Sequence, residues 1–180
     1  TKVSFLLMGF GSICRGVVLR GLALLAVEFV YFYYMITTGW SYMTQLATLG
    51  VKERVNDGLV IIEGDNSFLI LLYGVCSVLI TLFFLFIWRV NVRENREEEI
   101  LLGKGKKLPS LASDFKNLTD KHLDKTLLAL PLTGIVIFTV IPIIVMICVA
   151  FTNYDYEHQP PAKLFDWVGF DNFASVFSIG

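Results

Sequence analysis

Three long apolar stretches dominate the pattern of hydrophobic and polar residues along this chain. They cover residues 21–40, 68–88 and 127–151, and Glu28 is the one charged residue in all three. A helix rises about 1.5 Å per residue, so each stretch can cross a hydrocarbon core of roughly 30 Å. In that core a helix pairs its own backbone polar groups. We therefore predict an all-α integral membrane protein with three transmembrane helices.

The composition agrees with this class. Hydrophobic residues make up 55% of the chain and charged residues 17%, whereas soluble domains average about 45–50% and about 25%. The net charge of −1 argues against a nucleic-acid partner, which would require a basic face. Cys14, Cys76 and Cys148 are odd in number, far apart and set among apolar residues. We interpret them as packing residues rather than as a disulfide or metal site.

The distribution of positive charge predicts the orientation in the membrane. Residues 1–20 carry three of the 15 lysines and arginines, and residues 89–126 carry nine. Because positive residues collect in cytoplasmic loops, we expect a cytoplasmic N-terminus and a cytoplasmic 89–126 loop. Residues 41–67 and 152–180 are then extracellular. We interpret residues 1–20 as a segment at the inner membrane surface.

Several shorter patterns refine this outline. Residues 89–99 are densely charged and should continue the second helix, either as a solvated helix end or as a docking surface for a soluble partner, until Gly103 and Gly105 end it. Residues 102–113 then form a linker, and Thr119 or Asp120 caps the third helix. The run Asn56-Asp57-Gly58 predicts a turn.

Two prolines lie inside the third apolar stretch. Pro131 and Pro142 each lack an N–H and crowd the preceding helical turn. Neighbouring helices relieve such defects in transmembrane proteins. We expect a kink near Pro142, with a functional hinge as the alternative.

Glu28 is the unusual residue of the first apolar stretch. An ionisable group inside a span is costly and usually faces other helices or water. We expect a structural carboxyl that is protonated or hydrogen-bonded to Tyr31 or to another helix. A coupling or substrate role, and a span shifted so that Glu28 reaches water, are the alternatives.

No pattern of an enzyme is present. The sequence has no HExxH, CxxC or GxSxG motif, and the GKGKK run at residues 103–107 does not fit a phosphate-binding loop. His122 and His158 fall on opposite sides of the membrane in the predicted topology. We predict no catalytic, cofactor-binding or metal-binding residue, and therefore no enzyme.

Residues 130–173 carry a resemblance to a known family. The run LPLTGIVIFTVIPIIVMICVAFTNYD, followed by WVGFDNFASVF, resembles the MalF-type permeases of binding-protein-dependent ABC sugar importers. The two upstream spans resemble those of the same subgroup. Together with Glu28, the motif residues are our structural candidates: Pro131, Pro142, Asn153, Gly169, Asn172 and Phe173.

The chain departs from that family in two ways. Only residues 155–168 separate the third span from the NF element, so the large folded domain of some maltose permeases is absent there. The transport core and the cytoplasmic EAA loop of the family lie beyond these 180 residues. We therefore expect an N-terminal portion of a permease, in which residues 152–180 lead to the core. The substrate-binding residues stay unknown.

The resemblance implies a multi-subunit importer in a bacterial cell membrane. Its partners would be a second permease subunit, ATP-binding subunits that dock on parts outside this chain, an external sugar-binding protein and membrane lipid. The chain itself would hold no cofactor, and its sugar would be maltose or maltodextrin. The alternative is a small membrane-anchoring or regulatory protein complete at 180 residues.

Overall fold

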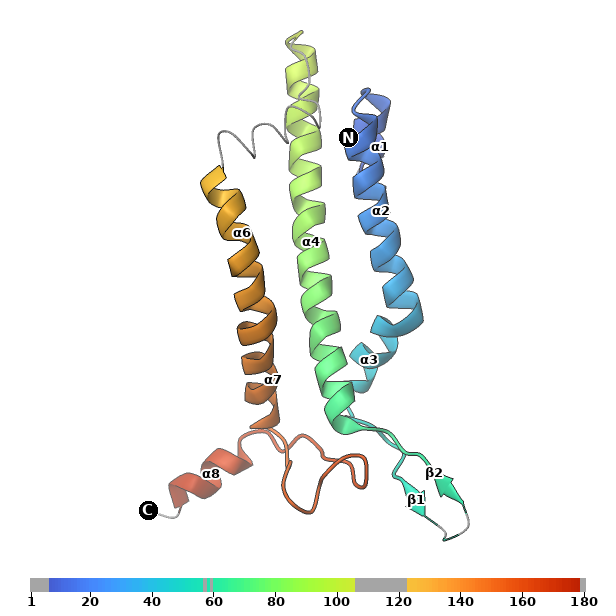
Figure 1. The fold of residues 1–180 in the computed structure, drawn as a ribbon, viewed down its shortest axis with the longest axis vertical. Coiled ribbons are helices and arrows are strands. Elements are labelled where there is room, and N and C mark those ends of the chain that lie inside the picture. The colour runs from blue at the N-terminus through green and yellow to red at the C-terminus, as the bar shows by residue number, and fades with distance from the viewer. Residues whose placement is uncertain (1–6, 57, 59, 106–122, 179–180) are drawn as a thin grey trace. The chain divides into compact units, whose positions relative to one another are not determined.

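The computed structural model describes residues 7–56, 58, 60–105 and 123–178. Almost all of its regular structure is helical (Figure 1). The helices are α1 (Phe10–Cys14), α2 (Val18–Tyr34), α3 (Trp40–Gln45), α4 (Ser67–Gly103), α6 (Leu123–Ile135), α7 (Ile141–Val149) and α8 (Asp171–Ser178). Two π-helical turns, η2 (Met35–Gly39) and η3 (Val136–Val140), join α2 to α3 and α6 to α7.

The three predicted spans are confirmed as helices. Stretches long and apolar enough to cross a membrane run through Val18–Gln45, Ser67–Gly103 and Leu127–Val149. Most large apolar side chains on them are exposed in this chain, as expected for surfaces that meet lipid or other helices. The helices extend past the predicted spans at residues 18–20, 41–45, 67 and 89–103.

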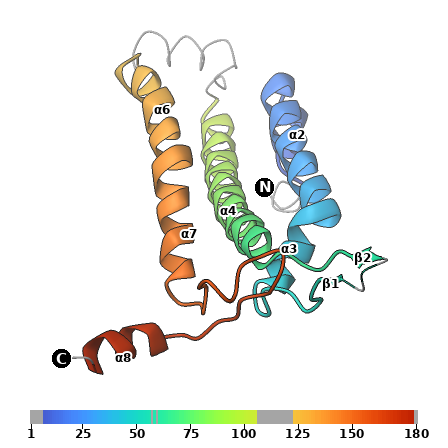
Figure 2. The same cartoon turned by 60° about the horizontal axis from the view of Figure 1, so that its bottom comes forward.

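A small β-ribbon adds to the helical fold. Strands β1 (Val55–Asn56) and β2 (Ile61–Ile62) pair antiparallel, with Val55 opposite Ile62 (Figure 2). Of the turn predicted at residues 56–58, Asn56 ends β1 and Gly58 follows it, whereas residue 57 lies outside the described residues. There the N–H of Gly58 donates to the Asn56 side chain at 3.3 Å, and Gly58 has a φ of 78° that suits glycine.

The chain divides into two compact units, which we describe separately. Unit 1 comprises residues 1–36 and 80–133, and unit 2 comprises residues 37–79 and 134–180. Helix α4 contributes residues to both units.

In unit 1 the short helix α1 folds back along α2 (Figure 1). The turn between them uses Gly16 at a φ of 87°, and the Val17 N–H donates to the Ser12 carbonyl at 2.9 Å. The backbones of α2 and of the turn before α1 lie so close together that a Cβ added at Gly21 would be 2.5 Å from the Gly9 carbonyl oxygen. Small residues permit such contacts between helices in membranes. Of the segment that we predicted at the membrane surface, helix α1 thus packs on the first span, and residues 1–6 lie outside the described residues.

Unit 2 has its own apolar core. The buried residues of this cluster are Leu49, Ile70, Leu71, Val75, Val145 and Phe165. They come from α4, from α7 and from the loops after α3 and before α8. The Phe165 N–H also donates to the Ser67 hydroxyl at 3.2 Å, so a residue of the later loop is fixed at the first turn of α4.

The third span departs from α geometry just before Pro142, near which we predicted a kink. Pro142 is the second residue of α7, and α7 follows η3 directly. Its missing N–H leaves the carbonyl four residues earlier without its usual donor, and this carbonyl lies within η3. Pro131 lies inside the α-helical segment α6.

The charged extension of the second span is also helical. Helix α4 ends at Gly103, and Gly105 has a φ of 67°, as the breaking role of these glycines predicted. Most of the predicted linker and the predicted cap at Thr119 or Asp120 lie outside the described residues.

Candidate functional sites

A charged cluster in unit 1 joins the N-terminal segment to α4. Arg15 follows α1, and its guanidinium donates to Asn95 at 2.9 Å, Glu98 at 2.8 Å and Glu99 at 3.3 Å. Arg20 of α2 donates to Glu98 at 3.2 Å and also to Glu94. We call these six residues the Arg–Glu clamp.

Glu98 is the centre of this clamp. Each of its carboxylate oxygens faces a different arginine, and its side chain is only 5% exposed. Asn95 continues the polar row, since its amide donates to the Asn91 side chain and carbonyl at 2.8 Å. Buried charges require partners of this kind. The clamp therefore fixes the N-terminal hairpin against the charged part of α4.

The sequence interpretation of residues 89–99 was wrong for this face of the helix. We expected solvated charges or a docking surface, whereas Asn91, Asn95 and Glu98 are buried. The other face is solvated as expected, since Arg89, Arg96 and the Arg93–Glu97 pair, at 3.1 Å, are exposed. The spacing of residues 91, 95 and 98 places them on one helical face, which was the available signal of a buried polar row. Their arginine partners lie about 80 residues away in the sequence.

Glu28 has a partner other than those that we considered. Its carboxylate is buried and accepts a hydrogen bond of 2.8 Å from the Met8 N–H. The Tyr31 hydroxyl instead donates to Thr81 at 3.3 Å. The carboxylate thus receives a backbone donor from the turn before α1, which matches a structural use of this residue.

In unit 2 the family-like motifs meet at the C-terminal end of α7. The side-chain amide of Asn172 donates to the carbonyls of Ala150 at 3.0 Å and Thr152 at 2.8 Å. The Gly169 N–H donates to the Phe151 carbonyl at 3.1 Å. These donors satisfy carbonyls of the residues that directly follow α7, where the helix provides no N–H partner.

Asn153 and Phe173 complete this arrangement, which we call the exit knot (residues 150–153 and 165–173). Asn153 exchanges two hydrogen bonds with Asp166, through its N–H at 3.0 Å and its side-chain oxygen at 2.6 Å. The rings of Phe151 and Phe173 lie 5.3 Å apart. Four sequence candidates thus come together, as supports for the backbone.

A further hydrogen bond anchors the exit knot within unit 2, and a glycine gives its backbone the required conformation. The indole N–H of Trp167 donates to the Leu46 carbonyl at 2.7 Å, at the end of α3. Gly169 has a φ of 61°, which glycine adopts without strain. In the sequence, Trp167 is marked only by its place in the motif.

A polar turn follows the exit from α7. Asp155 accepts hydrogen bonds of 2.8 Å from the His158 ring and from the N–H groups of Glu157 and His158. The hydrogen bond from the His158 side chain, followed by these backbone donors, lowers the pKa of Asp155 below its ordinary value. The turn therefore presents an ionised carboxylate at neutral pH.

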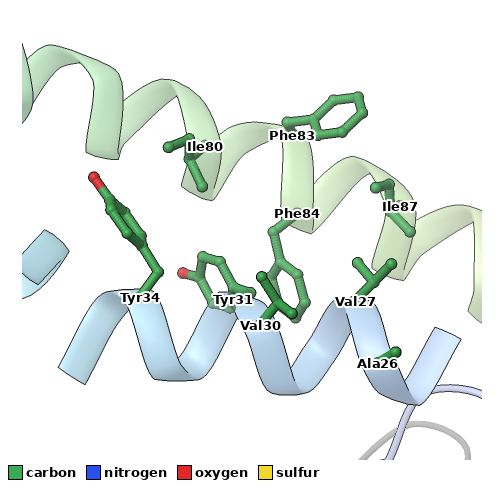
Figure 3. Close-up of a pocket in the computed structure, with 9 residues that line it drawn as sticks. All are labelled: Ala26, Val27, Val30, Tyr31, Tyr34, Ile80, Phe83, Phe84 and Ile87. Atoms are coloured by element: carbon green, nitrogen blue, oxygen red, sulfur yellow. The ribbon is translucent and has the colours of Figure 1, made fainter. Parts of the chain in front are cut away.

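An apolar groove of about 510 Å³ lies between α2 and α4 in unit 1 (Figure 3). Tyr31 and Phe84 stack beside it with ring centroids 3.8 Å apart. The groove is lined by Ala26, Val27, Val30, Tyr31, Tyr34, Ile80, Phe83, Phe84 and Ile87. This lining suits hydrocarbon and offers no carboxylate, amide or imidazole to a metal or a charged cofactor.

The described residues contain no group of three His, Cys, Asp or Glu side chains that could hold a metal ion. Cys14, Cys76 and Cys148 are free thiols. Cys14 is exposed in this chain, whereas the other two are partly buried.

Comparison with known proteins identifies relatives. The maltodextrin transport system permease protein MdxF of Bacillus subtilis is 30% identical over 173 residues, which cover 96% of this chain and 38% of that protein. The permease MalC of Streptococcus pneumoniae, also for maltodextrin, is 28% identical over 172 residues, which cover 95% of this chain and 38% of that protein. The galactooligosaccharides permease GanP of B. subtilis is 38% identical over 116 residues, which cover 64% of this chain and 28% of that protein. No family model and no solved structure matches the chain.

These relatives decide between the classes that the sequence left open. The chain spans about two fifths or less of their length. They are permease proteins, so the prediction that the chain is not an enzyme is confirmed, and a separate anchoring protein is not favoured. With three membrane-spanning helices, the prediction of a multi-pass membrane protein is confirmed as well. The chain is a homologue of the bacterial permeases for maltodextrin and related oligosaccharides, and this homology extends over nearly all of its 180 residues.

Proposed function

We propose that the chain forms the N-terminal part of the membrane-spanning permease subunit of a binding-protein-dependent ABC importer for oligosaccharides. The observation that carries this proposal is the alignment of 96% of the chain with a maltodextrin permease. The three spanning helices supply the matching architecture. Maltodextrin is the first candidate substrate.

In this proposal the chain is a scaffold rather than the transport path. The Arg–Glu clamp holds the hairpin of α1 and α2 on α4, and the exit knot fixes the end of α7. Transport requires bundles or repeats that move about a central site, which three helices do not provide. A second permease subunit, ATP-binding subunits and an extracellular sugar-binding protein complete the machine.

The proposed orientation places the Arg–Glu clamp in the cytoplasm and the exit knot outside. The positive residues of the N-terminal segment and of residues 89–126 support this orientation. Cysteine substitutions Ile100→Cys and Ser175→Cys test it in intact cells. An impermeant maleimide should label only Ser175→Cys, and labelling of Ile100→Cys from outside would reverse the topology.

A second substrate class has its own support. The galactooligosaccharides permease shows the higher identity, 38%, although over a shorter part of the chain. Galactooligosaccharides are therefore the alternative sugar for the same machine.

Reconstitution of the complete transporter in nanodiscs distinguishes the two sugars. ATP hydrolysis should rise with the cognate binding protein plus maltotriose, and not with the same protein plus galactobiose. The reverse result would favour galactooligosaccharides. Absence of stimulation by either sugar would reject the importer proposal in this form.

A further inference from the structure

A second cavity in unit 2 differs from the apolar groove in its chemistry. It has a volume of about 550 Å³ and lies between the end of the first long helix and the residues that lead into α4. Known small-molecule sites occupy about 300–1,000 Å³. The lining residues that the argument uses are Thr37, Thr38, Ser41, Tyr42, Gln45 and Asp65. We call it the polar cavity.

We propose that the polar cavity is a binding site for a neutral oligosaccharide. This inference deepens the proposed function, on which it rests, by adding a sugar contact to the N-terminal part of the permease. In the proposed topology the cavity opens on the extracellular side, where sugar would arrive.

The donors and acceptors of the cavity suit a polyhydroxylated ligand. Thr37, Thr38 and Ser41 bring hydroxyl groups, which both donate and accept, and Gln45 brings an amide with both abilities. A sugar hydroxyl is likewise both donor and acceptor. The lining includes no lysine, arginine or histidine, so nothing in it selects an anionic ligand.

Several of these polar groups are held in place before any ligand binds. One carboxylate oxygen of Asp65 accepts hydrogen bonds from the Val51 and Lys52 N–H groups at 2.9 Å and 3.0 Å. The Gln45 amide donates to the Ser41 hydroxyl at 2.9 Å. Groups fixed in advance lose less entropy on binding, which favours affinity.

An aromatic ring and a helix irregularity complete the site. Tyr42 packs beside Tyr73 at a centroid distance of 5.1 Å, and Tyr42 is one of the residues that line the cavity. Such a ring combines an apolar face with a polar hydroxyl, which matches the C–H face and the hydroxyl rim of a pyranose. Thr37 and Thr38 belong to η2, and single π-helical turns occur frequently at functional sites.

Cysteine protection tests the site in the assembled transporter. The complete permease that contains this chain is made cysteine-free, and Ser41→Cys is compared with Thr44→Cys. Both positions are exposed, but only Ser41 lines the cavity. Maltotriose at roughly ten times its dissociation constant should slow maleimide labelling of Ser41→Cys about tenfold, with no change at Thr44→Cys.

A second pair of variants controls for local damage at residue 41. Thr38→Val removes a hydroxyl from the cavity, whereas Thr44→Val makes the same change outside it. Thr38→Val should raise the concentration of maltotriose that gives half-maximal protection about fivefold, because one hydrogen bond to the sugar is lost. Thr44→Val should leave that concentration unchanged.

The outcomes separate this inference from the proposed function. Equal protection at both cysteine positions, no protection at either, or protection by tetraglycine but not by maltotriose would overturn the sugar site. If maltotriose still stimulates ATP hydrolysis in those cases, the importer proposal stands without it. Loss of that stimulation in the parent transporter would instead reject the importer proposal.

Discussion

The side-chain amide of Asn172 donates a hydrogen bond of 2.8 Å to the backbone carbonyl of Thr152. The same amide reaches the carbonyl of Ala150 at 3.0 Å. One side chain, twenty residues downstream, thus satisfies two carbonyls at the end of a transmembrane helix. These two hydrogen bonds explain structurally why the NF element of the motif has an asparagine at position 172.

Replacing Asn172 by alanine should therefore destabilise unit 2. We expect Asn172→Ala to lower the free energy of unfolding by about 1–2 kcal/mol, because two carbonyls lose their donor. Thermal unfolding of the purified protein in nanodiscs measures the effect. Asn56→Ala, which removes one exposed hydrogen bond in the ribbon, is the control and should change the stability less. Equal shifts for the two variants would contradict the capping role.

Glu28 should tolerate glutamine but not leucine. Glu28→Gln keeps an acceptor for the Met8 N–H, so sugar uptake by the complete transporter should stay near normal. Glu28→Leu leaves this buried donor unpaired, which costs about 1–3 kcal/mol. Uptake and thermal unfolding, measured together, distinguish the two effects. Loss of uptake in Glu28→Gln at normal membrane abundance would show a functional carboxylate.

Neighbouring glutamates of α4 should differ strongly in their contribution to stability. Glu98→Gln removes the charge that faces two arginines in a buried site, and breaking such pairs costs about 3–5 kcal/mol. Glu97→Gln disrupts only the exposed pair with Arg93, which is worth about 0.3–0.5 kcal/mol. Chemical denaturation in mild detergent compares them. Similar losses for both variants would show that the clamp is not a stabilising site.

Asp65 should titrate below an ordinary aspartate. The hydrogen bonds from the Val51 and Lys52 N–H groups stabilise its charged form and lower its pKa in the folded protein. The stabilising effect is therefore present above the ordinary pKa of about 3.9 and is lost as the pH falls through the lower, folded value.

Carbon NMR of labelled aspartate carboxyl groups measures this pKa. The assigned Asp65 resonance should have its midpoint below that of an unfolded reference peptide. Hydrogen exchange at Val51 and Lys52 should accelerate over the same acidic range. A midpoint at or above the reference value would mean that the two backbone hydrogen bonds do not form in solution.

The spans were predictable because their signal is local. Each depends on about 20 consecutive apolar residues, and hydrophobicity alone decides it. The sequence also placed the end of α4 near Gly103, since glycine acts on its own turn. The kink predicted near Pro142 stays a prediction, although the π-helical turn η3 lies just before that residue. The motif residues Asn153 and Asn172 were recognised by resemblance, but their mutual arrangement was not.

The missed features depend on residues far apart in the chain. The partners of Arg15 are about 80 residues away, so no local pattern marks Glu98 as buried. The partner of Glu28 is a backbone N–H, which any residue at position 8 except proline could supply. The two-residue strands of the ribbon are too short for an alternating pattern to show.

The close contact of Gly9 with Gly21 has a consequence for the order of biosynthesis. These glycines lie only 12 positions apart, so the hairpin of α1 and α2 closes a short loop and can pack as soon as both segments leave the ribosome. The bonds from Phe165 to Ser67 and from Trp167 to Leu46 join residues 98 and 121 positions apart. The nascent chain thus buries Glu28 early, whereas the exit knot must wait until all three spans have been synthesised.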